Sequence, residues 1–263
     1  LGATLANELG VSATGYGAGS SRPVIRGLEG SRVQILQNGL SVGDVSNISQ
    51  DHAVGNNMQN AHQVEILRGA AALLYGSGSS GGLVNVVNDR ILTNLPDRPT
   101  GAINTSYETV NNGRAGSLEV DGAIGSVAVH LDTAINNANN YSIPGSSTQS
   151  QGEPIGGWTV PPEGNGGNNY TGKLPNSFSN QNNLGFGLSY IGNSGYTGVS
   201  VERLNNNYGI PTPEGGSINQ SQNRYDFQHQ TRDPFSGFSS FKFISYPKRS
   251  TRFARCLFGS WAL

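Results

Sequence analysis

An adjacent aspartate and histidine, Asp51 and His52, are the residues whose types and spacing suggest the most specific chemistry in this chain. A carboxylate and a neutral imidazole both bind zinc, and a zinc site needs three or four ligands in all. Two neighbours in one loop cannot complete such a site, so other ligands are needed, and His62, Glu163 and Glu214 are the candidates within this chain. The alternative is a turn in which the Asp51 side chain closes an Asx-type hydrogen bond.

The glycine-rich residues 76–82 could be taken for a nucleotide-binding loop. They lack the Gly-Lys-Ser/Thr ending of a phosphate-binding loop, and Leu83 does not clearly open a long helix. The triplet centred on Ser77 also lacks the Gly-x-Ser-x-Gly spacing of a hydrolase nucleophile. No pair of carboxylates is marked as catalytic. We therefore predict no enzyme, no catalytic residue and no resident cofactor.

The composition excludes several classes of protein. With 16 basic and 17 acidic residues, the 263-residue chain has a net charge of −1, so we expect no large basic surface for nucleic acid. There is no run of about 18 apolar residues that could cross a bilayer as a helix. The single cysteine, Cys256, excludes a disulfide framework and a site with several thiolate ligands. Low cysteine with abundant glycine and asparagine suits Gram-negative envelope proteins.

The chain divides near residues 94–99, and the part before this point has the pattern of a small α+β domain. Residues 32–36, 64–67 and 83–87 are aliphatic or β-branched runs of strand length, separated by glycine-rich turns. We therefore expect a first domain over residues 1–94, which is an ordinary size for a single core.

After Pro99 the side chains alternate between apolar and polar with a period of two, most clearly over residues 117–135. There, Leu118 and Val120 share one face, while His130 and Asp132 share the opposite one. The same pattern recurs less cleanly at residues 104–110, 184–191, 197–204 and 224–231.

Short and long connections alternate between these expected strands. Short turns at residues 125–126 and 192–194 are followed by long polar loops at residues 136–181 and 205–222. Strands of about ten residues joined in this way are typical of an outer-membrane β-barrel. The alternative is a soluble sandwich of half-buried strands.

A more specific pattern is carried jointly by three segments, 22–27, 32–39 and 64–87. The third segment contains the string Glu-Ile-Leu-Arg-Gly, then Leu-Tyr-Gly-Ser-Gly, then Gly-Gly-Leu-Val-Asn. In this order and spacing they resemble the plug domain of TonB-dependent outer-membrane receptors, over residues 1 to about 90. The positions that the resemblance marks as structural are Arg26, Gly27, Arg68, Gly69, Tyr75, Gly76, Gly78, Gly81 and Gly82. The glycines permit positive φ and close chain approach, and the resemblance implies that Arg26 and Arg68 tie the plug to acids of the barrel wall and to its own backbone.

The resemblance implies an α+β plug domain followed by antiparallel strands of a 22-stranded transmembrane β-barrel. It also implies a receptor in the Gram-negative outer membrane, in contact with its lipid, that takes up a scarce nutrient with energy delivered by a TonB protein. Two departures are expected. We expect the segment that would contact TonB and the first part of the plug to be missing. Residues 99–246 are expected to be the first strands and loops of the barrel, and since residues 99–263 can hold only about six or seven strands, we expect the barrel to be incomplete. Residues 247–263, with four basic residues and no alternation, are expected to be an atypical tail of the kind that a frame shift would produce.

Within this family, residues 37–46 followed by 49–53 look like the zinc-uptake subgroup, in which an adjacent aspartate and histidine at the plug apex help bind zinc. The resemblance therefore favours Asp51 and His52 as metal ligands and zinc as the cargo. His130 and Asp132 could also be ligands, but a polar lumen is expected in any such barrel. The alternatives are a receptor for a siderophore or another metallo-ligand, and a Gly/Asn-rich surface adhesin or structural β-protein without transport.

Overall fold

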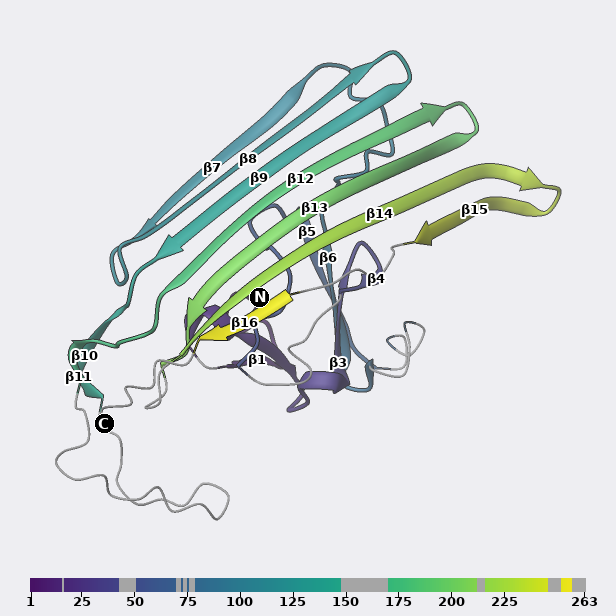
Figure 1. Ribbon diagram of the computed structural model, residues 1–263. Helices are drawn as coiled ribbons and strands as arrows, with labels where there is room; N and C mark the ends of the chain where they lie inside the picture. The colour runs from purple at the N-terminus through teal and green to yellow at the C-terminus, as the bar shows by residue number, and fades with distance from the viewer. Residues whose placement is uncertain are drawn as a thin grey trace.

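The chain folds into an amino-terminal domain and a long antiparallel sheet, which lie against each other in the computed structural model (Figure 1). The structure describes residues 1–15, 17–42, 51–69, 72, 75, 79–147, 170–211, 216–245 and 252–256. Five residues named above, Gly76, Ser77, Gly78, Glu163 and Glu214, lie outside these ranges. Within the described ranges, no helix has the length and apolar character needed to cross a bilayer.

The amino-terminal domain contains short elements of both kinds. They are α1 (Gly2–Leu5), β1 (Val11–Thr14), the 3-10 turns η1 (Ala18–Ser20) and η2 (Gly30–Arg32), β2 (Arg22–Ile25), β3 (Val33–Gln37), β4 (Leu40–Ser41), β5 (Gln63–Leu67) and β6 (Gly82–Val87). Strands β1 and β2 form an antiparallel pair, and the other four form a sheet in the order β4-β3-β6-β5. The strands expected at residues 32–36, 64–67 and 83–87 are β3, β5 and β6, which confirms the α+β class.

Aliphatic side chains from these strands form the core of the domain. Strand β3 pairs with β6 in parallel, and β5 pairs with β6 antiparallel, so β6 is covered on both edges. The buried core residues are Leu5, Val11, Ile25, Val33, Ile35, Val42, Val54, Val84 and Val86. β-Branched residues suit a pleated, buried surface, which explains why these runs form strands.

A two-residue turn at Asn38 and Gly39 reverses the chain between β3 and β4. Both residues have positive φ, 53° and 79°, as a type I′ hairpin turn requires. The turn is held from β6, where the Asn85 side chain accepts a hydrogen bond from the Gly39 backbone N–H at 2.8 Å. The turn brings Gln37 to the edge of the domain that meets the long sheet.

The long sheet is built from strands that follow one another along the chain. They are β7 (Thr100–Glu108), β8 (Gly113–Ile124), β9 (Val127–Ala138), β12 (Ser179–Gly192), β13 (Gly195–Gly209), β14 (Ser217–Phe235) and β15 (Phe238–Ser245), with β16 (Arg252–Cys256) beside β14. A separate pair, β10 (Ser142–Ser147) and β11 (Tyr170–Lys173), lies within the connection from β9 to β12. The short turns expected at residues 125–126 and 192–194 join β8 to β9 and β12 to β13.

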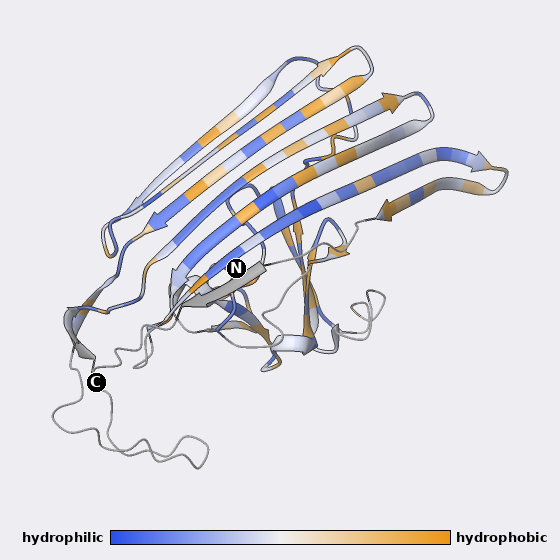
Figure 2. Ribbon diagram, viewed as in Figure 1, coloured by the Kyte–Doolittle hydropathy of each residue, from blue (hydrophilic) through white to orange (hydrophobic). Residues whose placement is uncertain are grey.

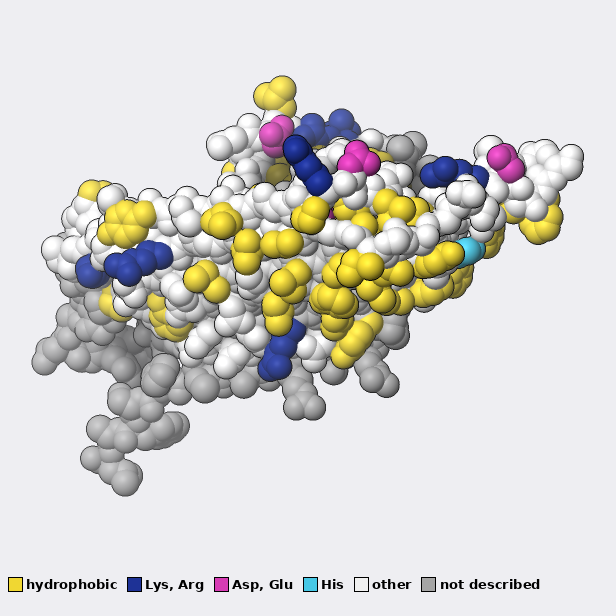
Figure 3. All heavy atoms as spheres, turned by 90° about the horizontal axis from the view of Figure 1, so that it is seen from above, with side chains coloured by type: hydrophobic (Ala, Val, Ile, Leu, Met, Phe, Trp, Pro, Cys, Tyr) yellow, Lys and Arg dark blue, Asp and Glu magenta, His cyan; other side chains and the backbone are white. Residues whose placement is uncertain are grey.

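The two faces of the long sheet differ in chemistry, as the period of two predicts. Hydropathy alternates along several strands of the long sheet in Figure 2, and hydrophobic side chains are spread over the outer face in Figure 3. Exposed apolar residues on the strands include Leu118, Val120, Leu131, Leu184, Phe186, Val199, Tyr225 and Phe227. Buried polar residues on the opposite face include His130, Asp132, Asn183, Ser200, Glu202, Asn206, Gln220, Arg224 and Asp226. This arrangement suits a sheet with lipid on one side and protein on the other.

The strands are longer than the sequence pattern predicts. The expected loop at residues 205–222 is shortened because Asn205, Asn206 and Asn207 pair with Ser221, Gln220 and Asn219 in the β13–β14 ladder. Side chains support this extension, since Asn205 donates to Asn182 and accepts from Ser221, each at 2.9 Å. Such cross-strand hydrogen bonds offset the low strand propensity of asparagine.

The end of the chain also contains more strand than expected. Strand β15 was not anticipated from the sequence, and β16 lies within residues 247–263, for which we expected no strand pattern. Strand β16 pairs antiparallel with β14, from Ser217 opposite Cys256 to Ser221 opposite Arg252. Part of this tail is therefore integrated into the long sheet.

Candidate functional site

The junction between the amino-terminal domain and the long sheet is centred on Arg90, which follows β6. Its side chain is 2% exposed. The Nε and Nη2 atoms donate to the two oxygens of Asp132 at 2.6 and 2.9 Å, and Nη1 donates to Glu202 Oε2 at 2.9 Å. Burial alone would lower the pKa of Arg90, but the charges and hydrogen bonds of Glu202 and Asp132 outweigh it and raise that pKa above its ordinary value. The arginine therefore clamps β9 and β13 to the end of the domain.

Amide side chains complete the hydrogen bonding of the two carboxylates that Arg90 contacts. From the domain, Gln37 donates to Glu202 at 2.8 Å and Asn60 donates to Asp132 at 2.6 Å. From β12, Asn183 donates to the second oxygen of Glu202. The buried charges are therefore paired and hydrogen-bonded, which is the condition for burying them without a large penalty.

A second arginine holds the turn at Gln37 from the other side. Arg224 on β14 donates from Nε to both oxygens of Asp226 at 2.9 Å, and from Nη2 to the backbone carbonyl of Gln37 at 3.1 Å. Gln37 thus contacts the long sheet through its side chain and through its backbone. This links β3 to both β13 and β14.

Two histidines lie between carboxylates near the short-turn end of β8 and β9. His62, just before β5, faces Asp89 through Nδ1 and Glu119 through Nε2, each at 2.8 Å. Burial alone would lower the pKa of His62, but its hydrogen bonds to Glu119 and Asp89 and their charges raise it above its ordinary value. His130 on β9 faces Asp121 through Nδ1 at 2.7 Å and Asp132 through Nε2 at 3.3 Å.

The predicted metal ligands, Asp51 and His52, lie on the loop that leads to β5. Their side chains contact each other, with His52 Nδ1 at 2.7 Å from Asp51 Oδ1. The loop is held by Tyr208 of β13, whose buried hydroxyl accepts from the Ala53 backbone N–H at 2.7 Å and donates to the Asp51 carbonyl at 2.9 Å. The structure therefore joins Asp51 and His52 to the end of the long sheet opposite the short turns. It places His62 with Asp89 and Glu119 instead.

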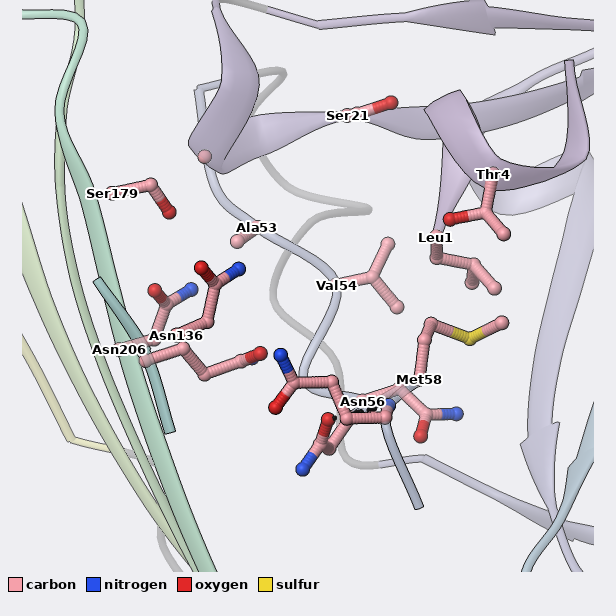
Figure 4. A pocket seen from close by; sticks show the side chains of 14 residues that line it. Leu1, Thr4, Ser21, Ala53, Val54, Asn56, Met58, Asn136, Ser179 and Asn206 are labelled. Carbon is pink, nitrogen blue, oxygen red and sulfur yellow. Dashed lines mark hydrogen bonds between the residues drawn. The ribbon is translucent and has the colours of Figure 1, made fainter. Parts of the chain in front are cut away.

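A polar cavity of about 250 Å³ lies beside this loop, between the domain and strands β9, β12 and β13 (Figure 4). Asn136, Ser179 and Asn206 line it from the sheet, and Asn56 and Met58 line it from the loop, as Figure 4 shows. Its side chains are amides, hydroxyls and aliphatic groups, without a charged side chain among those that line it. Its chemistry suits water or a neutral polar group.

The positions that the plug resemblance marks as structural differ in backbone conformation and in burial. Arg26 and Gly27 form an exposed turn with φ of 51° and 78°, and Gly69 has φ of 80°. At Gly82, φ is 136° and an added Cβ would lie 2.8 Å from the Leu67 carbonyl oxygen, so this position needs glycine. The remaining described positions are Arg68, which is partly buried, Tyr75, which is exposed, and Gly81, which is buried.

In the described residues, neither Arg26 nor Arg68 makes an ion pair with an acid of the long sheet, and Arg90 makes that connection. Arg90, Glu202 and Tyr208 were not singled out from the sequence. The sequence does contain a signal for Glu202, because the period of two places it on the inward face of its strand. A buried charge there needs an ion-pair or hydrogen-bond partner.

Comparison with known families identifies the amino-terminal domain. Residues 1–83 match the family model described as the TonB-dependent receptor plug domain. The amino-terminal domain therefore has the plug fold that this family model describes. The plug domain is therefore the element that packs on the polar face of the long sheet, and Arg90 follows directly after it.

Solved structures share the fold over most of this chain. The copper transporter OprC matches with a TM-score of 0.68 and 13% identity, over 93% of this chain and 34% of that one. The FrpB iron transporter from Neisseria meningitidis matches with a TM-score of 0.70 and 13% identity, over 94% and 37%. The siderophore receptor PirA from Pseudomonas aeruginosa matches with a TM-score of 0.57 and 17% identity, over 94% and 36%. The fold is thus a plug domain followed by antiparallel strands of a receptor barrel, and the chain spans about a third of these relatives.

Replacing Tyr208 by phenylalanine is expected to loosen the loop at Asp51 and His52. The ring stays in place, but the Ala53 N–H loses its acceptor and the Asp51 carbonyl loses a donor. An unsatisfied buried polar group costs about 1–3 kcal/mol, so thermal unfolding followed by circular dichroism in detergent should show a drop of that size. Tyr190→Phe, on the exposed face, is the matched control and should change nothing measurable. Equal stability of Tyr208→Phe and wild type would contradict this role.

Proposed function

We propose that this chain is part of a TonB-dependent receptor in the Gram-negative outer membrane, which takes up a metal ion or a metal chelate. The observation that carries the proposal is a plug domain clamped to the polar face of a sheet whose other face is apolar. In this arrangement outer-membrane lipid contacts the apolar face and the plug domain closes the lumen. The partners are then a TonB protein, which supplies energy, and the transported metal or chelate.

The plug domain also separates transport from adhesion. A surface adhesin or structural β-protein has no need of a folded domain bound to the inner face of its sheet. Here that contact includes buried ion pairs from Arg90 to two strands and the contact of Arg224 with Gln37. Uptake of the metal by cells that carry the receptor should therefore require TonB, and uptake that is equal with and without TonB would contradict the proposal.

Zinc is the cargo that we favour, and the geometry at Asp51 and His52 supports it. Asp51 contacts the Nδ1 side of the His52 ring at 2.7 Å. A carboxylate in this position fixes the ring orientation and directs the other ring nitrogen, Nε2, to a metal. In this arrangement His52 is the ligand and Asp51 either orients it or adds an oxygen. The other ligands that zinc needs are to be sought in loops near the Tyr208 end of the sheet.

A zinc titration of the purified chain in detergent tests this assignment. We expect His52→Gln to weaken zinc binding at this site by at least about tenfold, because a site of three or four ligands loses one of them. His229→Gln is the matched control, since the His229 ring contacts the hydroxyls of Thr197 and Thr231 and no carboxylate among the described residues. If His52→Gln and wild type bind zinc equally, zinc is not held by this pair.

A ferric siderophore is the second candidate, and the cavity beside the loop favours it. Its amide and hydroxyl lining offers hydrogen bonds to the oxygen atoms of a chelate, whereas a bare cation is better matched by charged ligands. Two of the solved relatives are named as an iron transporter and a siderophore receptor. The same titration with a ferric siderophore in place of zinc distinguishes the two, because the siderophore should bind the His52→Gln variant and wild type equally.

A further inference from the structure

The plug-facing side of β8 and β9 carries a group of side chains that no part of the proposed function uses. Glu119 and Asp121 on β8 and His130 on β9 have ligand atoms within 4.8 Å of one another, the one such group among the described residues. We propose that these three residues bind a divalent transition-metal ion at the junction of the long sheet and the plug domain. A tetrahedral zinc ion spaces its ligand atoms about 3.4 Å apart, so small side-chain rotations would close this group around a metal.

The surroundings of His130 fix the ring in the orientation that a metal ligand needs. Asp132 lies 3.3 Å from Nε2 and is itself held by Arg90 and Asn60. A proton on Nε2 that points to Asp132 leaves the lone pair on Nδ1, which faces Asp121 at 2.7 Å. A metal-bound histidine usually donates its other N–H to a carboxylate in this way, which sets the tautomer and strengthens the ligand.

The charge balance also favours a cation here. Arg90 neutralises Asp132 and Glu202. Asp89, Glu119 and Asp121 have no arginine or lysine partner among the described residues, and the groups paired with them are the imidazoles of His62 and His130. Even as imidazolium ions, the two histidines carry two positive charges against these three carboxylates, so a net negative charge remains. A divalent cation between Nδ1 of His130 and the oxygens of Glu119 and Asp121 satisfies all three groups.

The mixture of ligands selects the class of ion. Imidazole with carboxylates suits zinc and its neighbours among the transition metals, whereas magnesium prefers oxygen ligands and water. Glu119 and Asp121 are about one-fifth exposed, so an ion can reach them, while His130 is buried. His62 contacts both oxygens of Glu119, at 2.8 and 2.9 Å, and acts as a positioning residue for that carboxylate.

This site is distinct from Asp51 and His52, and it does not depend on the identity of the cargo. Tyr208 on β13 pairs with Ser179 on β12, and Ser179 pairs with Ala138 on β9. His130 on β9 pairs instead with Gly187 on β12. Ala138 and His130 are eight residues apart in β9, which corresponds to about 27 Å along an antiparallel strand. The two candidate sites therefore lie at opposite ends of the long sheet.

Zinc titration with a competing chromophoric chelator on the full chain in detergent tests the proposal. We compare wild type with His130→Gln, Glu119→Gln, His52→Gln and the control His229→Gln, and repeat each titration with magnesium. We expect His130→Gln and Glu119→Gln each to weaken one zinc site by at least about tenfold. His52→Gln and His229→Gln should retain that site, and magnesium should not compete for it.

The variants separate the two hypotheses. If His52→Gln binds like wild type while His130→Gln loses a site, the zinc cargo assignment fails and the site on β8 and β9 stands. If both His130→Gln and Glu119→Gln bind zinc like wild type, the three residues only form salt bridges and the proposal is overturned. Should buried His130 be required for folding, Glu119→Gln decides, because that residue is partly exposed. Cobalt bound to the His52→Gln variant should give visible absorption, and adding Glu119→Gln to that variant should reduce it. If the added substitution leaves the absorption unchanged, the proposal is contradicted.

Discussion

Replacing Arg90 by alanine is expected to lower the free energy of unfolding by about 3–5 kcal/mol, the cost of removing one partner from a buried ion pair. The change leaves the carboxylates of Asp132 and Glu202 buried and without their cation, since Arg90 bonds to both. It should also release the end of the plug domain from β9 and β13. Thermal unfolding followed by circular dichroism, with limited proteolysis between Val87 and Thr100, measures both effects.

Two comparisons make the Arg90 experiment specific. Arg98→Ala removes the same charge from an exposed position in the same connecting segment, and should change stability by less than about 0.5 kcal/mol. Adding Asp132→Asn and Glu202→Gln to the Arg90 variant removes the unpaired charges and should restore part of the loss. If Arg90→Ala is as stable as Arg98→Ala, the clamp does not hold the domain.

Replacing Gly187 by alanine is expected to destabilise the protein by about 3 kcal/mol, at the upper end of the range for inserting a methyl group into a packed site. Gly187 lies on β12 directly against Arg90, and an added Cβ would overlap the Arg90 backbone carbonyl oxygen. A backbone atom cannot rotate away as a side chain can, so the connecting segment must move from the sheet. The same thermal unfolding and proteolysis measurements detect this.

Gly122→Ala is the matched control for Gly187→Ala. Gly122 is also a strand glycine of the long sheet, but an added Cβ there meets no atom within 4 Å. Alanine at this position should be neutral or slightly stabilising, because it reduces the freedom of the unfolded chain. A loss of stability equal in the two variants would mean that glycine is needed for the strand itself and not for the approach of Arg90.

The period of two in the sequence was sufficient to predict most of the long sheet. At Leu118, Val120, His130 and Asp132 the alternation correctly separated the exposed face from the buried face. It failed where polar residues continue a strand, as at Asn206, because hydrophobicity carries no signal there and the ladder is supported by hydrogen bonds. Strand β15 was missed because its alternation is short and irregular: apolar Ile244 directly follows Phe243 and breaks the period of two.

The candidate sites were predicted only in part, for a physical reason. Asp51 and His52 are neighbours in the chain, so their combination is visible in the sequence. The group of Glu119, Asp121 and His130 depends on how β8 and β9 pair. The clamp from Arg90 to Glu202 joins residues 112 positions apart. Contacts of that kind follow from strand order and register, which a single sequence does not specify.

The contact surface between the plug domain and the long sheet has a consequence for how the two could move apart. Many of the side chains that meet there are amides, carboxylates and guanidinium groups, including Gln37, Asn60, Asn183 and Arg224. Water can replace each of these contacts at little enthalpic cost, so a small displacement draws solvent into the gap instead of opening an empty space. Hydrogen bonds to water then replace the lost contacts as the two parts separate. The main resistance to a pulling force comes from the few buried ion pairs, such as those of Arg90.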